Sequence, residues 1–171
     1  MESAREPATT RTEKATFGAG CFWKPEMQFR ELDGVVDTAV GYEGGHVDNP
    51  TYEQVCGGDT GHVEVVEVQF DPARVDYEQL VEKYFEIHDP TQLNRQGPDV
   101  GHQYKSVIFA HGDEQAEKAK RVLERTQESY RQPVVTEVEP AKPFWRAEEY
   151  HQCYLEKRGI VSGLVGQLFG R

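Results

Sequence analysis

The sequence is short of cysteine, of positive charge and of long apolar runs. Its three cysteines, Cys21, Cys56 and Cys153, are an odd number at wide spacing. This spacing fits neither a disulfide framework nor a zinc site built from close cysteine pairs. The six histidines are scattered, and no two of them have the i, i+4 spacing of a helical metal site. We therefore expect free thiols in a reducing compartment and no bound metal.

Basic residues are outnumbered by acidic ones. The 19 Lys and Arg residues stand against 30 Asp and Glu, which gives a formal net charge of -11 at pH 7. Such a chain repels phosphate backbones and anionic lipids, and no segment approaches the roughly 20 consecutive apolar residues that span a bilayer. The opening MESAREPATTRTEK is polar and does not resemble a signal peptide. We expect a cytoplasmic monomer that binds neither nucleic acid nor membrane.

The size of the chain suits one domain. A length of 171 residues with 37% hydrophobic content is enough for one ordinary core. We expect a disordered lead-in over residues 1–13, a single domain over 14–158 and a glycine-rich C-terminal tail over 159–171. No internal repeat or low-complexity block is present.

Apolar periodicity predicts strands that alternate with helices. We expect strands over residues 15–20, 34–45, 63–70, 105–111 and 134–139, and helices over 22–32, 49–58, 75–88, 113–130 and 146–158. In the second helix Asn49 is the expected cap, with Pro50 in the first turn. Some strands follow one another without a helix between them, which favours an α/β (α+β) fold: a two-layer sandwich of a mixed sheet with helices packed on it.

The segment GAGCFWKPE, residues 18–26, places Cys21 after two glycines, at the expected start of a helix. Gly18 and Gly20 permit a tight turn and a close approach by a substrate or another backbone. A thiol beside the first turn of a helix ionises more easily, which makes Cys21 a candidate nucleophile. Because Pro25 lacks an N–H group and prefers the first helical position, the regular helix could instead start at Lys24 or Pro25. The alternative is that Cys21 is an inert, buried cysteine.

Two further features of the sequence have a functional and a structural interpretation. Phe22 and Trp23 either belong to the core or wall an apolar pocket that holds a methyl or thioether group. In the strand 63–70, side-chain alternation puts Glu64 on the more apolar face. There its pKa would be raised, as a general acid near neutral pH requires. Alternatively, Glu64 lies at the strand end, where solvent or a neighbour satisfies it.

Two irregular segments interrupt the alternation: a glycine-rich region over residues 41–61 and a long polar connection over 88–104. Tyr52 lies in the first, and Asp99 and Tyr104 lie in the second. Tyrosine hydroxyls there could donate hydrogen bonds to a polar substrate oxygen. Two other functions stay open: a cysteine acyl-transferase or peptidase with His62 or His102 as base, and a metal-binding or redox-sensing module.

Five segments carry a resemblance to a known family: GCFW, YEGG, NPTYEQVCGGDTGHVEVV, HDPTQLNRQGPDVGHQYKS and FWRAEEYHQCYLEK. Together they resemble the A-type peptide methionine sulfoxide reductases from about Ala15 to Lys157, in the right order. The resemblance implies a sandwich with a ferredoxin-like core. It also implies reduction of the S epimer of methionine sulfoxide, free or in proteins, without a bound cofactor.

The resemblance also assigns roles. Cys21 would attack the sulfoxide sulfur and become a sulfenic acid, while Phe22 and Trp23 receive the methyl group and Glu64 protonates the oxygen. Tyr52 and Tyr104 would hydrogen-bond that oxygen, and Asp99 would support the site. Lys24 and Pro25 stand where a glycine is more familiar after the tryptophan, which alters the rim of the pocket.

Recycling is where the sequence departs from the family pattern. In the family a second cysteine near the C-terminus forms a disulfide with the first, and thioredoxin reduces it. Here no cysteine follows Gly159, and Cys153 stands in YHQCYLEK, where a polar residue is expected. Cys153 is our first choice as the resolving thiol and Cys56 the alternative. Direct reduction by another external thiol is a third route.

Overall fold

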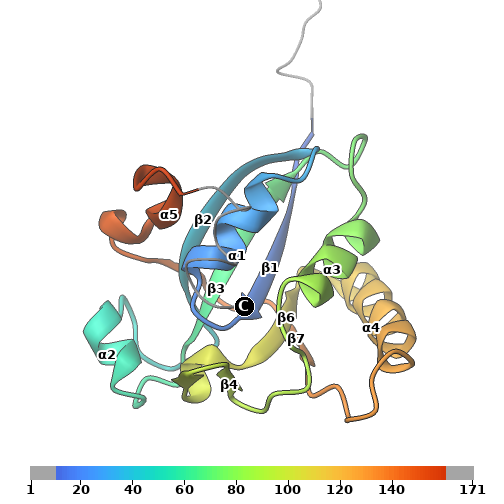
Figure 1. The fold of residues 1–171 in the computed structure, drawn as a ribbon. Coiled ribbons are helices and arrows are strands. Elements are labelled where there is room, and N and C mark those ends of the chain that lie inside the picture. Colours follow the sequence, from blue (N-terminus) through green and yellow to red (C-terminus); the bar gives the residue numbers. More distant parts are fainter. Residues whose placement is uncertain (1–10, 161–171) are drawn as a thin grey trace, which may run out of the picture.

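A computed structural model describes residues 11–160 of the chain (Figure 1). Its helices are α1 (Trp23–Arg30), α2 (Tyr52–Cys56), α3 (Tyr77–Glu86), α4 (Asp113–Gln127) and α5 (Tyr154–Lys157), with 3-10 turns η3 (His102–Tyr104) and η4 (Glu149–His151). Its strands are β1 (Glu13–Ala19), β2 (Val35–Glu43), β3 (Val63–Phe70), β4 (Arg95–Gln96), β5 (Asp99–Val100), β6 (Ser106–Ala110), β7 (Glu137–Pro140) and β8 (Trp145–Arg146). Within this described range, no helix combines the length and the apolar character needed to cross a membrane.

The main sheet has six strands in the order β7-β6-β1-β3-β2-β8. It is mixed, because β6 and β7 pair in parallel while the other neighbours are antiparallel. Helix α1 connects β1 to β2, and α3 connects β3 to β6. The four central strands β6-β1-β3-β2 with these two helices form the expected ferredoxin-like core.

The helices cover one face of the sheet, with α1 and α3 in front of the central strands and α4 beside α3 (Figure 1). On that face Phe17 of β1 stacks on Phe29 of α1 and on Tyr84 of α3, with ring centroids 5.0 Å apart in both pairs. The opposite face carries a smaller cluster around Val65 and Phe109, against which Phe144 packs. The sequence-predicted two-layer sandwich is confirmed.

The predicted helix over residues 146–158 is wrong. The chain instead runs from β8 through η4 to the short α5, and Cys153 between them has a left-handed backbone with φ 51°. Gln152 explains the interruption, because its buried amide accepts from the Val40 N–H and donates to the Val40 carbonyl, both at 2.9 Å. A side chain thus continues the pairing that β8 begins along β2.

Other boundaries also differ. Thr51, not Asn49, caps α2, because Thr51 accepts from the Gln54 N–H while Asn49 adopts φ 50°. Helix α1 begins at Trp23 despite Pro25, whose missing N–H would be unpaired in a first turn anyway. The long connection contains the β4–β5 hairpin and η3. Of the expected lead-in and tail, residues 1–10 and 161–171 lie outside the described residues.

Candidate active site

Cys21 lies in the turn between β1 and α1, two residues before the helix begins. Gly20 before it has φ 89°, and an added Cβ there would stand 2.8 Å from the Cβ and Cγ atoms of Gln96. Gly20 therefore permits the close approach that the sequence suggested. The group that approaches it is the Gln96 side chain of the connection over residues 88–104. Gly18 is equally crowded, since its added Cβ would lie 2.8 Å from Val107.

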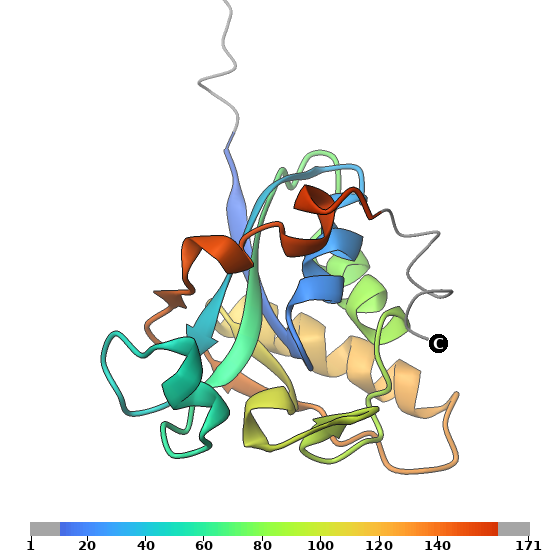
Figure 2. The ribbon, with the colours of Figure 1, turned by 60° about the vertical axis from the view of Figure 1, so that its left-hand side comes forward.

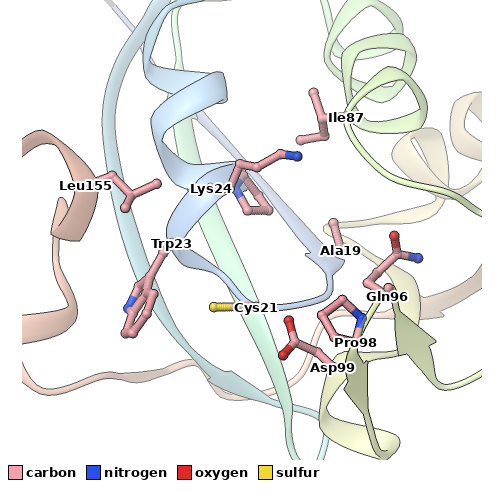
Figure 3. Close-up of a pocket in the computed structure, with 11 residues that line it drawn as sticks. Ala19, Cys21, Trp23, Lys24, Ile87, Gln96, Pro98, Asp99 and Leu155 are labelled. Atoms are coloured by element: carbon pink, nitrogen blue, oxygen red, sulfur yellow. The ribbon is translucent and has the colours of Figure 1, made fainter. Parts of the chain in front are cut away.

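The Cys21 sulfur borders a cavity of about 440 Å³. Figure 3 shows the sulfur between the Trp23 indole on one side and the Asp99 carboxylate on the other. Most of the remaining lining is apolar, and it comes from the end of β1, from α1, from the segment between α3 and β5, and from α5: Ala19, Pro25, Ile87, Pro98 and Leu155. The cavity is large enough for a small, mostly apolar group beside the thiol.

The prediction that Cys21 ionises easily is wrong for the unliganded protein. Burial, and then the nearby Glu64 carboxyl, raise the pKa of the Cys21 thiol to about 12, although the Trp23 N–H opposes this shift. The helix end supplies a hydrogen bond, but desolvation and negative neighbours outweigh it. Cys21 is therefore a protonated thiol at neutral pH.

Glu64 is 1% exposed and sits on β3 opposite Tyr42 of β2. Its Oε1 accepts from the Phe22 N–H at 3.2 Å, while its buried Oε2 has no hydrogen-bond partner within the described chain. Burial raises the Glu64 pKa to about 8, the Phe22 N–H opposes this, and Asp99 adds to it. Alternation along β3 predicted this apolar face, and the group carries a proton at neutral pH.

Phe22 and Trp23 both face the C-terminal segment, but they differ in burial. Phe22 is 1% exposed and belongs to the core, whereas half-buried Trp23 also lines the cavity. The Trp23 indole stacks on Tyr154 with centroids 3.7 Å apart, and its Nε1–H donates to Nδ1 of His151 at 3.0 Å. Phe22 thus matches the core interpretation made from the sequence, and Trp23 matches the pocket interpretation.

Tyr52, the first residue of α2, and Tyr104 of η3 both lie beside Cys56, the last residue of α2. Both tyrosines lower the pKa of the Cys56 thiol, against the larger effect of burial, and burial raises the pKa of each tyrosine. Glu148 anchors this corner, because it accepts from the Tyr52 N–H and from the Tyr42 hydroxyl, both at 2.8 Å. The tyrosines therefore stay protonated and available as hydrogen-bond donors.

Asp99 is presented by the β4–β5 hairpin, which the loop's own hydrogen bonds order. The Gln96 amide, for example, donates to the Asp89 carbonyl at 2.6 Å and accepts from the Asp89 N–H at 3.0 Å. Burial raises the Asp99 pKa. The negative charge of Asp99 in turn helps to raise the pKa values of Cys21 and Glu64, so these three groups share one electrostatic environment.

The two candidate resolving cysteines occupy different surroundings. Cys56 is exposed at the end of α2 and is electrostatically coupled to both Cys21 and Glu64. Cys153 is engaged with α1 instead: its N–H donates to Glu26 Oε1 at 2.8 Å and its thiol to Oε2 at 3.8 Å. Cys56, our second choice, is therefore the candidate whose charge contributes to the raised pKa of the Cys21 thiol.

The alternatives based on histidine gain no support from the geometry. Both ring nitrogens of buried His62 are engaged, one by the Gly45 N–H at 3.0 Å and the other by the Val47 carbonyl at 2.7 Å. Exposed His102 bonds to the Gly61 carbonyl at 3.0 Å. Within residues 11–160, no three His, Cys, Asp or Glu side chains gather in a way that could hold a metal ion.

His151 is the site residue that sequence reasoning missed. It is 1% exposed and lies against Phe22, Trp23 and Tyr52, with ring centroids 4.4 to 5.8 Å away. A signal was present, because histidine in an apolar and aromatic setting needs a polar partner. The helix expected over residues 146–158 hid this signal, because a histidine on the exposed face of a helix would find its hydrogen-bond partners in water.

Comparison with known proteins gives a consistent result. The sequence model of a family described as peptide methionine sulfoxide reductase matches residues 13–162. The peptide methionine sulfoxide reductase MsrA of Acidobacterium capsulatum is 59% identical over 151 residues, which cover 87% of this chain and 97% of that one. Among solved structures, reduced Mxr1 from Saccharomyces cerevisiae has a TM-score of 0.84 at 38% identity, covering 91% of this chain and 90% of Mxr1. Mxr1 in complex with Trx2 has a TM-score of 0.61 at 26% identity, with 89% of each chain covered.

Proposed function

The chain belongs to the peptide methionine sulfoxide reductase family of oxidoreductases, and we propose that it reduces the S epimer of methionine sulfoxide, free or in proteins, with Cys21 as nucleophile. One observation carries the assignment of the site. The thiol borders an apolar cavity, and the next residue's N–H binds a buried carboxyl whose second oxygen is unpaired in the described structure. A nucleophile at an apolar cavity, with a protonated acid bonded to the adjacent residue, suits a methyl sulfoxide.

The chemistry transfers one oxygen atom. The Cys21 sulfur attacks the sulfoxide sulfur while Glu64 gives its proton to the sulfoxide oxygen, and Glu64 takes up the proton that the thiol releases. The oxygen then passes to Cys21. The thiol is oxidised by two electrons to a sulfenic acid, and the sulfoxide is reduced by two electrons to methionine. A Glu64 pKa near 8 keeps this proton available at neutral pH.

The other residues orient the substrate. The indole of Trp23 packs against the core cluster that includes Phe22, and it also lines the cavity. There it receives the methyl group of the substrate. The hydroxyls of Tyr52 and Tyr104, both protonated at neutral pH, donate hydrogen bonds to the sulfoxide oxygen. Asp99 holds the opposite wall through the β4–β5 hairpin.

Recycling proceeds through a disulfide. The Cys56 thiol attacks the sulfenic acid, a bond forms between the two sulfur atoms, and water leaves. Two thiols of thioredoxin then reduce this disulfide, a partner that the complex of Mxr1 with Trx2 supports. We place Cys56 before Cys153 because its thiol is coupled to Cys21, whereas the Cys153 thiol bonds to Glu26. The enzyme needs no bound cofactor in this scheme.

A single-turnover assay tests the nucleophile. Reduced protein is mixed with excess methyl sulfoxide in the absence of another thiol, and methionine formed per protein molecule is measured. Cys21→Ser forms none, because a hydroxyl cannot accept the oxygen as a sulfenic acid. Cys56→Ser and Cys153→Ser each form methionine in the first turnover and serve as controls. Methionine formation by Cys21→Ser would disprove the proposed function.

A further inference from the structure

A set of hydrogen-bonded polar side chains lies in the core beside the end of β1. Its centre is Ser106, the first residue of β6, whose hydroxyl oxygen lies 2.8 Å from the Tyr84 hydroxyl and 2.7 Å from the Thr136 hydroxyl. The same oxygen is 2.8 Å from Nε2 of His88. The Tyr84 hydroxyl also donates to the Gly18 carbonyl at 2.8 Å. The oxygen transfer described above uses none of these groups.

The hydrogen atoms of this set can be assigned from their partners. Nδ1 of His88 lies 2.7 Å from the Tyr84 carbonyl, which can only accept, so Nδ1 carries a proton. Burial lowers the His88 pKa to about 4, so the ring is neutral at neutral pH and Nε2 accepts from the Ser106 hydroxyl. The Ser106 hydroxyl therefore has no proton left for Tyr84. The single proton of the Tyr84 hydroxyl is shared between the Gly18 carbonyl and the Ser106 oxygen.

Tyr84 thereby joins two parts of the site that are remote in sequence. Gly18 lies on β1, three residues before Cys21, whereas His88 is the first residue of the connection over residues 88–104. Figure 2 shows this connection, in yellow-green, passing from the end of α3 below the blue end of β1. The two parts meet again where Gln96 packs on the backbone next to Cys21. The connection is thus held against the turn between β1 and α1 at two points.

The position of this connection matters because it presents Asp99 to the cavity. Figure 3 shows Gln96 beside the end of β1 and the Asp99 carboxylate on the side of the Cys21 sulfur opposite the indole. The titratable neighbours of Glu64 in the described structure are Cys21, Tyr42, Tyr52, Cys56, Asp99 and Tyr104. Burial first and Asp99 after it raise the pKa of Glu64. A displaced connection would admit water and remove this carboxylate, and both changes lower the pKa.

We propose that the Tyr84 hydroxyl is a positioning group, which holds the 88–104 connection against the backbone before Cys21 and so keeps the Asp99 wall of the cavity in place. Tyr84 is 0% exposed and does not line the cavity, so it acts only through the groups that it holds. The inference rests on the proposed function in one respect, the use of Cys21 as nucleophile and of Glu64 as acid.

The pH profile of the single-turnover rate tests this role, with two tyrosines of α3 as a matched pair. Tyr84 and Tyr77 both stack on Phe17, with ring centroids 5.0 and 6.4 Å away, but the buried Tyr77 hydroxyl has no hydrogen-bond partner within the described chain. In the parent, proton donation by Glu64 is lost above about pH 8. We expect Tyr84→Phe to move this alkaline limb down by roughly one pH unit and Tyr77→Phe to leave it in place. Limbs at the same pH in the two variants would overturn the proposal.

Alkylation of Cys21 provides a readout that needs no turnover. With Cys56→Ser and Cys153→Ser combined, Cys21 is the only cysteine of the chain. The thiolate is the form that reacts with iodoacetamide, so a lower thiol pKa speeds the reaction at any pH below that pKa. In this background we expect Tyr84→Phe to speed alkylation about tenfold, which corresponds to one unit of pKa, and Tyr77→Phe to leave the rate unchanged.

The two measurements separate the positioning role from the proposed function. Equal alkylation rates in Tyr84→Phe and Tyr77→Phe would refute the positioning role, even in a protein that reduces sulfoxides normally. A protein that reduces no sulfoxide but shows the difference in alkylation would refute the proposed function and leave the role of the hydroxyl intact.

Ser106→Ala covers the case in which Tyr84→Phe does not fold. It removes the link to His88 while the Tyr84 hydroxyl keeps the Gly18 carbonyl as its acceptor, so only the 88–104 connection is released. We expect the alkaline limb to move to lower pH in this variant too. A limb at the position of the parent would mean that the connection is held without Tyr84, and the proposal would fail.

Discussion

Glu64 shows how a single residue acquires its chemistry from its surroundings. Its position on the apolar face of β3 removes water from the carboxyl, and burial raises its pKa to about 8. The Cys21 thiol, with a pKa of about 12, does not titrate in the same range. Any change of rate between pH 6 and 9 in the chemical step is therefore expected to report Glu64.

We predict a falling rate above about pH 8 in single-turnover experiments. A raised carboxyl pKa means that the acid form is present below this pH and is lost above it, so proton donation fails on the alkaline side. Glu64→Gln removes the acid and slows the step by a factor on the order of 10²–10⁴. Its residual rate should be independent of pH in this range, and an unchanged falling limb in Glu64→Gln would assign the limb to another group.

At the residue scale, the sequence predicted the face of the strand on which Glu64 lies, but it did not predict the surroundings of Cys21. Alternation along β3 put Glu64 on the apolar face, as the structure has it. The expected activation of Cys21 failed because desolvation and the proximity of Glu64 depend on the packing of segments far apart in the chain. The hydrogen bond of His151 could not be foreseen for the same reason, since its partner Trp23 lies 128 positions away.

Two short elements carry the candidate resolving thiols. Cys56 ends α2, which is followed by Gly57 and by Gly58 with φ 86°. Cys153 precedes α5 and is tied to Glu26 of α1. The N-terminal end of α2 is held by Thr51 and Glu148, whereas Cys56 lies at the other end, before the two glycines. We therefore expect the C-terminal end of α2 to deliver its thiol to Cys21.

Mass spectrometry after one turnover distinguishes the two elements. We predict a Cys21–Cys56 disulfide in the parent and in Cys153→Ser. Cys56→Ser instead accumulates the sulfenic acid of Cys21, which dimedone traps, and loses turnover supported by thioredoxin. A disulfide that disappears in Cys153→Ser would identify Cys153 as the resolving thiol, and disulfide formation in neither variant would indicate an external thiol.

The attachment of the C-terminal segment to β2 depends on Gln152. Its amide pairs with the N–H and carbonyl of Val40 and also donates to the Ala147 carbonyl at 2.9 Å. We predict that Gln152→Met, which keeps the volume, destabilises the protein by about 1–3 kcal/mol for each buried backbone group left unpaired. Urea unfolding measures the loss. Exposed Gln132→Met is the control, and equal stability of the two variants would contradict the prediction.

At the element scale, the regular helices and the long strands were predictable and the C-terminal segment was not. The periodicity of α3 and α4 and the alternation of β3 are local properties. The interruption at Gln152 is not, because it depends on a bond to Val40, 112 residues away. The β4–β5 hairpin was likewise hidden in a polar segment without apolar alternation.

The whole molecule was predicted as a two-layer sandwich with a ferredoxin-like core, and the sheet order confirms this. One consequence of this architecture is that both faces of the sheet bury a carboxyl group. Glu64 lies on the helix side, and Glu43 lies at the end of β2, where burial raises its pKa to about 7 although the Lys142 N–H opposes the shift. Both groups hold protons in the folded state that the unfolded chain releases.

We predict that these two carboxyls lower the stability of the fold as pH rises from about 4.5 to 8. In this window the folded state binds more protons than the unfolded state, so the free energy of unfolding falls with increasing pH. Glu43→Gln and Glu64→Gln each remove one contribution, and their stability relative to the parent should rise between pH 5 and 8. Urea unfolding at several pH values measures this, and a difference independent of pH would contradict it.

The contact between Gly20 and Gln96 has a consequence for which sulfoxides fit. Gln96 packs directly on the backbone of Gly20, next to Cys21, and its side-chain amide makes two hydrogen bonds to the Asp89 backbone. The space left for a substrate therefore depends on the absence of a Cβ atom at Gly20 and on Gln96, which takes no part in the proposed oxygen transfer. Substitutions at the contact between Gly20 and Gln96 would change the tolerance for bulkier alkyl groups most readily, because the thiol, the acid and the aromatic rings can all remain as they are.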